Sequence, residues 1–76
     1  MQRKIEICKK YKHFKGHIYK VINIATDSET LEKMVVYENI LDGDVWVRSY
    51  DMFNSLVDKE KYPDVNQKYR FESVDE

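Results

Sequence analysis

Hydrophobic and polar residues follow the period of a β-strand along much of the chain. Residues 17–25, HIYKVINIA, are rich in isoleucine, valine and tyrosine, which predicts a strand buried on much of both faces. Residues 33–41 and 45–49 predict two more strands, and Asp42-Gly43 between them is typical of a tight hairpin turn. Gly16, just before the first of these strands, suits a turn or a bulge.

The hydrophobic period becomes helical after residue 50. Asp51 can cap a short helix that ends near Asp58 and whose apolar positions are Met52, Phe53, Leu56 and Val57. Residues 69–74, YRFESV, predict a last strand, and the segment around KYKHF can supply a first one. We therefore predict a mainly β fold: a small antiparallel SH3-like barrel of four to five strands with one short helix before the last strand, because closure removes exposed strand edges. Met52 and Phe53 would plug one end of this barrel, and an open sheet with the helix packed across it is the alternative.

The predicted hairpin sorts its residues into two faces. With a two-residue loop, Tyr37 lies opposite Arg48 and Asn39 opposite Trp46, and side chains alternate across each strand. The predicted core face carries Val36, Ile40, Val45 and Val47. The other face presents Tyr37, Asn39, Trp46, Arg48 and Tyr50. Aromatic rings combined with hydrogen-bonding groups are typical of a binding surface. A shift of one residue in the pairing of the two strands would exchange the two faces. The single tryptophan, Trp46, can equally have a structural role.

The charge is unevenly distributed, although the net charge of the 76 residues is only −1. The first 20 residues carry seven Lys or Arg side chains against one acid, Glu6, and the rest of the chain is acidic. We expect a single domain over residues 1–76 in which residues 1–10 form a basic arm that is free to be flexible. Such an arm can approach phosphate or can neutralise the acidic body.

The sequence also bears on the location of the protein. No apolar run approaches the roughly 18 residues of a membrane span, and the start, MQRKIEICKK, lacks a signal-peptide stretch. Cys8 is the only cysteine, which excludes an internal disulfide and a Cys-rich zinc site. A cytoplasmic location without a membrane partner is the simplest expectation.

Candidate catalytic and metal-binding chemistry is sparse. His13 and His17 have a spacing that binds metal on a helix, but Gly16 interrupts the segment, and on a strand the two lie about 13 Å apart. Cys8 has no positioned base beside it, and two glycines cannot build a Gly-rich phosphate loop. A chain of this length buries only about 60% of its unfolded surface, which leaves little room for a deep pocket. We therefore expect no enzyme activity, no catalytic residue, no metal site and no cofactor.

Five separated segments carry a family resemblance: YKHFKG, IYKVINIA, SET, VVY and WVRSYDMF, with a weaker echo in YRFESV. Together they resemble the small bacterial proteins of domain-of-unknown-function family 1653. The resemblance implies a compact, β-rich, bacterial cytosolic domain that usually stands alone, and it implies no activity. The sequence departs from the family pattern at His17, where asparagine or another polar residue is expected, at Ser49, which replaces a proline, and in a short LDGDV turn.

These patterns favour a non-enzymatic binding module. Its predicted ligand-binding face combines Tyr37, Trp46 and Arg48, with His13 and Lys15 contributing from the neighbouring turn. The ligand would be flat or anionic: a nucleotide-like small molecule, a nucleic acid or a protein tail. The alternative is a protein–protein interaction or homo-oligomeric assembly domain, such as a homodimer, that uses the same aromatic face.

Overall fold

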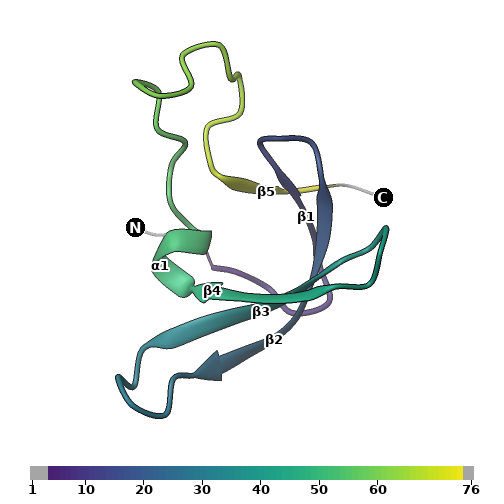
Figure 1. Cartoon of the computed structure of the whole chain (residues 1–76), viewed down its shortest axis with the longest axis vertical. Helices are drawn as coiled ribbons and strands as arrows, with labels where there is room; N and C mark the ends of the chain where they lie inside the picture. The colour runs from purple at the N-terminus through teal and green to yellow at the C-terminus, as the bar shows by residue number, and fades with distance from the viewer. Residues whose placement is uncertain (1–3, 75–76) are drawn as a thin grey trace.

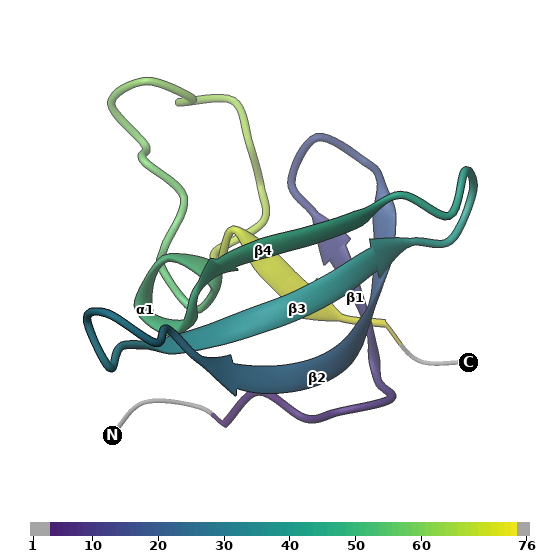
Figure 2. The same cartoon turned by 60° about the horizontal axis from the view of Figure 1, so that its bottom comes forward.

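The computed structural model describes residues 4–74, which form one five-stranded sheet and one short helix. The elements in chain order are β1 (Lys10–His13), β2 (Ile18–Thr26), β3 (Lys33–Asn39), β4 (Val45–Ser49), α1 (Tyr50–Phe53) and β5 (Phe71–Ser73). Neighbouring strands are all antiparallel, in the order β4-β3-β2-β1-β5, and the sheet is strongly curved (Figures 1 and 2). The predicted mainly β fold, with one short helix before the last strand, is confirmed.

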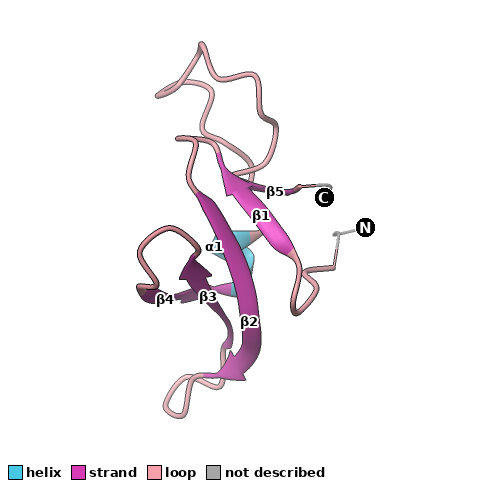
Figure 3. Ribbon diagram, turned by 90° about the vertical axis from the view of Figure 1, so that its right-hand side faces the viewer, coloured by secondary structure: helices cyan, strands magenta, loops and turns pink. Residues whose placement is uncertain are grey.

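The curved sheet is open and does not close into a barrel. In the described part of the chain β4 and β5 form its two edges, share no ladder and lie at separate margins of the sheet (Figure 3). The connection from α1 to β5 rises beside the β1–β2 hairpin (Figures 1 and 2). It is pinned at its base by an isolated bridge between Leu56 and Tyr69, and the Gln67 side-chain amide donates to the Lys12 carbonyl at 2.8 Å. A loop and its side chains, rather than a strand ladder, therefore span the opening.

The core lies on the concave face of the sheet and is mostly aromatic. Phe53 from α1 stacks on Phe71 from β5 with ring centroids 4.0 Å apart, and both side chains are buried. Tyr37 from β3 meets both rings edge-on, at 5.2 and 5.5 Å. The other buried members of this cluster are Ile5, Tyr11, Val21 and Val35. Residues from both ends of the described chain thus complete one core.

Helix α1 is shorter than predicted and begins two residues earlier. Ser49 is the N-cap in place of Asp51, and its Oγ accepts a hydrogen bond from the Met52 N–H at 3.2 Å. The single turn ends at Phe53, well before Asp58. Phe53 fills the core as predicted, whereas Met52 is half exposed.

The β3–β4 hairpin has a longer loop than the predicted two residues. Tyr37 lies opposite Trp46, two residues away from the predicted register, and the loop spans residues 40–43. Gly43 has a φ of 80°, and its N–H donates to the Asn39 carbonyl at 2.8 Å. A shift of two residues keeps the same side chains on the same face, so the two predicted sets of residues stay together.

The prediction of which set faces the core is wrong. Val45 and Val47, predicted to be buried, are 58% and 60% exposed, and Ile40 is also exposed. Val35 and Tyr37, on the opposite face, are buried. The reason is non-local: β5 and α1 place their phenylalanine rings over the Tyr37 side of the sheet, and no described element covers the valine side.

Part of the predicted N-terminal arm packs against the domain. Ile5 is buried in the core cluster, and its N–H donates to the Tyr50 hydroxyl at 2.8 Å. Glu6 and Lys9 form an exposed ion pair at 2.8 Å, and Cys8 is exposed. Arg3, which contributes to the predicted basic arm, lies outside the described residues.

Candidate anion-binding site

A pocket of about 290 Å³ lies where the tip of the β1–β2 hairpin, β4 and the connection to β5 meet. Its lining is rich in positive charge and includes the cationic side chains of Lys15, Arg48, Lys61 and Arg70. Asp58 is the one carboxylate in the lining. The pocket is therefore a site at which an anion would be attracted.

The hairpin tip places His13, Phe14 and Lys15 at this pocket. The His13 N–H donates to the His17 carbonyl, and the Gly16 N–H donates to the His13 carbonyl, both at 2.8 Å. Gly16 has a φ of 106°, a conformation that favours glycine, as expected for the turn predicted at this position. This tight turn ends β1 and places the side chains of Phe14 and Lys15 beside the connection between α1 and β5.

The same turn brings the backbones of the two histidines together, but their rings pack against different partners. The His13 ring lines the pocket, whereas the His17 ring lies against Tyr19 with centroids 6.4 Å apart. Within residues 4–74 no group of three or more His, Cys, Asp or Glu side chains is arranged to hold a metal ion.

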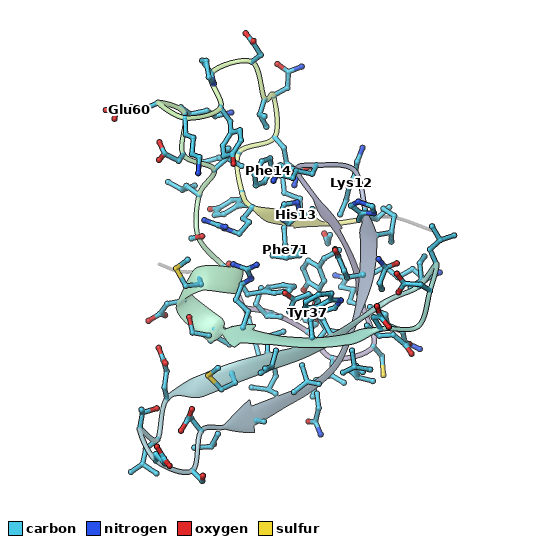
Figure 4. The ribbon with its side chains drawn as sticks, in the orientation of Figure 1. Lys12, His13, Phe14, Tyr37, Glu60 and Phe71 are labelled. Atoms are coloured by element: carbon cyan, nitrogen blue, oxygen red, sulfur yellow. The ribbon has the colours of Figure 1, made fainter. Side chains whose placement is uncertain are left out.

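His13 lies between two phenylalanine rings and close to several cations (Figure 4). Its ring stacks on Phe14 at 4.4 Å and meets Phe71 edge-on at 4.9 Å. Burial, followed by the positive charges of Arg48, Arg70 and Lys15, lowers the pKa of His13 from 6.5 to about 4. The imidazole is therefore neutral at pH 7.

The neutral His13 ring has a defined tautomer. Its Nδ1 accepts a hydrogen bond from the Lys15 N–H at 3.1 Å, so the proton resides on Nε2. A neutral imidazole in this tautomer offers one N–H donor. His13 can thus donate a hydrogen bond to an anion without adding to the repulsion among the cations.

Both arginines are held by neutral partners. The Arg48 Nε donates to the Tyr37 hydroxyl at 3.4 Å, and its guanidinium lies 5.9 Å from the centroid of Phe71. The Arg70 Nε donates to the Ser55 Oγ at 3.2 Å. No ion pair joins either arginine to a carboxylate of residues 4–74. The positive charge of the pocket is therefore not compensated by a carboxylate salt bridge.

The turn after α1 supplies the opposite wall of the pocket. The Tyr62 N–H donates to the Asp58 carbonyl at 2.8 Å, and the Asp58 Oδ1 accepts from the Glu60 N–H at 3.0 Å. The Tyr62 ring packs against Phe14 with centroids 4.8 Å apart, and the Lys15 ammonium lies 5.8 Å from the Tyr62 ring. Cationic and aromatic groups from two separate segments thus border the same space.

The structure brings together three of the five predicted site residues. His13, Lys15 and Arg48 line the pocket. Tyr37 is buried in the core beneath it and reaches the site only through its hydroxyl contact with Arg48. Trp46 is 53% exposed and lies outside the pocket lining.

Sequence reasoning missed five residues of the lining: Phe14, Asp58, Lys61, Tyr62 and Arg70. No local pattern marks them, because the connection after α1 meets the hairpin only in the folded chain. The Arg70 carbonyl, for example, accepts a hydrogen bond from the Phe14 N–H at 3.1 Å.

Residues 9–73 match the family described as "Protein of unknown function (DUF1653)". The chain belongs to this family. The resemblance predicted from the sequence segments is thereby confirmed, and every residue that lines the pocket lies within the DUF1653 region. No curated protein and no solved structure shows significant similarity to the chain. None of the helices in the described part of this DUF1653 domain is long and apolar enough to cross a bilayer.

Proposed function

We propose that this domain is a non-enzymatic binding module whose pocket holds a flat, phosphate-bearing small molecule, of which a mononucleotide is the simplest example. The observation that carries the proposal is the grouping of Lys15, Arg48, Lys61 and Arg70 around one pocket without a salt-bridge partner for any of them in the described chain. Bringing like charges together is unfavourable, and a bound anion relieves the repulsion.

The cationic groups suit a phosphate group. Guanidinium groups can bind two phosphate oxygens at once, whereas lysine ammonium groups act as point charges. Arg48 and Arg70 are already oriented by Tyr37 and Ser55, so little side-chain freedom would be lost on binding. The Nε2–H of His13 supplies a further, uncharged donor.

The aromatic wall accounts for the flat part of the ligand. Phe14 and Tyr62 pack against each other at the pocket, and stacking of a base on an aromatic ring is worth about 1–3 kcal/mol. The volume of about 290 Å³ is at the lower end of the range for small-molecule sites. These features favour a single nucleotide over a longer polymer.

Calorimetric titration with adenosine monophosphate tests the proposal. The double variant Lys15→Met, Lys61→Met removes two exposed charges from the lining, and we expect it to bind at least about tenfold more weakly. Lys33→Met, which removes an exposed charge outside the lining, is the matched control and should bind like the wild type. Equal affinities in the double variant and the control would refute the proposal.

Two further titrations separate the parts of the ligand. Inorganic phosphate should bind more weakly than adenosine monophosphate, and equal affinities would show that the aromatic wall makes no contribution. A single-stranded oligonucleotide that bound more tightly than the mononucleotide, with a steep dependence on salt, would instead identify a nucleic-acid site.

A further inference from the structure

Within residues 4–74, β4 is an edge strand, and no described strand pairs with its outer side. The Asn39 N–H donates to the Asp44 carbonyl, so hydrogen-bonded pairs with β3 recur at Trp46 and Arg48. The N–H and C=O groups of Val45 and Val47 consequently point away from β3. β4 lies at the margin of the sheet, as Figure 3 shows.

This edge carries few of the features that usually prevent strand pairing. Natural edge strands are protected by charged side chains, proline, a bulge or short length. β4 has the sequence VWVRS: Arg48 is its single charged side chain, it contains no proline, no register shift interrupts its ladder with β3, and its three apolar side chains are each more than half exposed. The opposite edge, β5, is protected by its length of three residues.

We propose that β4 pairs in antiparallel fashion with β4 of a second copy of this chain, about a two-fold axis at Val47. The two sheets then become one continuous sheet, and Val47 of each copy lies opposite Val47 of the other. Val45 lies opposite Ser49 of the second copy, and the outward backbone groups of all these positions form the new ladder.

The sequence of β4 is complementary to itself in this register. Trp46 lies opposite Arg48 of the second copy in a pair without backbone hydrogen bonds, where side chains approach most closely. A guanidinium over an indole ring is a favourable cation–π pair, and both side chains lie on the same face of the sheet. The Arg48 guanidinium already lies over Phe71 with its Nε bonded to Tyr37, so the indole would approach it from the side of the second copy. This complementarity favours a second copy over an unrelated extended segment.

The exposed apolar surface supports the same arrangement. Val45 and Val47 lie on the convex face beside the half-buried Val36, which is opposite Val47 in the β3–β4 ladder. The two-fold axis joins these valines with those of the second copy into one stripe across the interface. Pairing would also cover Trp46, an exposed tryptophan that the pocket does not use.

Light scattering after size-exclusion chromatography of the full chain, over a range of concentrations, tests this proposal. We expect a dimer that dissociates on dilution, together with a red shift of the Trp46 emission. Val47→Lys places two ammonium groups opposite each other across the axis, and the dissociation constant of the dimer should rise at least about tenfold. Val47→Thr keeps the strand propensity without adding charge and should remain dimeric.

A second substitution distinguishes strand pairing from other contacts. Val47→Pro removes only an outward N–H and no bond to β3, so it should yield a folded monomer, as judged by circular dichroism. A wild-type chain that stays monomeric at every concentration would overturn the proposal, and so would a dimer that persists in Val47→Lys. Arg48 belongs both to this strand and to the lining of the anion-binding pocket, but the proposed ladder uses the outward backbone groups of Val45, Val47 and Ser49, which do not line the pocket.

Discussion

The environment of His13 provides the sharpest test of the pocket's electrostatics. Burial and the cations Arg48, Arg70 and Lys15 lower the pKa of its imidazole to about 4. An anion bound among these cations opposes their field and favours the protonated ring. A unit negative charge about 6 Å from the ring contributes about 2–3 kcal/mol near a protein surface, which would raise the pKa of His13 to about 6.

This rise in the pKa of His13 determines how the affinity for the anion changes with pH. Because the anion-bound state holds the His13 proton more tightly than the free state, binding takes up a proton between about pH 6 and pH 4. Anion affinity should therefore increase as the pH falls through this range and should be nearly constant above it. Sulfate is the appropriate probe, because it does not titrate in this range as phosphate does.

Proton NMR of the imidazole signals measures the effect directly. His17→Gln leaves His13 as the only histidine. His17 lies outside the pocket lining and is the smallest of the causes that lower the His13 pKa, so its removal leaves the burial of His13 and the charges of Arg48, Arg70 and Lys15 in place. The His13 signal should titrate near pH 4 without sulfate and near pH 6 when sulfate saturates the protein. A free pKa close to 6.5, or a pKa that sulfate does not raise, would refute the reasoning.

Three further predictions concern stability. The folded pKa of His13 lies below its unfolded value of 6.5, so its contribution to the free energy of unfolding is present above pH 6.5 and is lost as the pH falls to about 4. After allowance for solvent screening, this contribution amounts to about 1–2 kcal/mol, and the stability measured by urea unfolding should depend less on acid in His13→Gln than in the wild type. Phe53→Ala should lower the free energy of unfolding by about 3–5 kcal/mol, whereas Leu41→Ala, on an exposed loop, should change it by less than about 0.5 kcal/mol; similar losses would contradict the assignment of the core. Gly43→Ala should lower the free energy of unfolding by about 1 kcal/mol, seen as a lower melting temperature, because Gly43 has a φ of 80°. Gly43→Asn should lower it less, and an unchanged melting temperature in Gly43→Ala would contradict the hairpin geometry.

The sequence contained enough local information to predict the strands but not the side on which they pack. The predicted strand 45–49 coincides with β4, and the predicted strand at 17–25 is displaced from β2 by one residue. The face of the hairpin that packs inward depends on Phe53 and Phe71, which come from other parts of the chain. Valine-rich positions suggested the core face, but Tyr37 on the opposite face meets these phenylalanines and is buried.

The candidate site was predictable to a similar extent. His13 and Lys15 stand in a turn that the glycine marks, and Arg48 follows the tryptophan in a recognisable strand. Arg70 and Tyr62 could not be predicted, because they belong to an irregular connection whose path is fixed by contacts such as Gln67 to Lys12. The sequence pattern thus indicated a site of cationic and aromatic side chains, whereas the fold determined which of these side chains lie together.

The most direct test of the central claim is a map of backbone amide shifts in the isotopically labelled protein during titration with adenosine monophosphate. We predict that the largest changes occur at Lys15, Lys61, Tyr62 and Arg70, the residues that border the pocket from two separate segments. Changes confined to the Trp46 strand, or no changes at millimolar nucleotide, would contradict the proposed binding site.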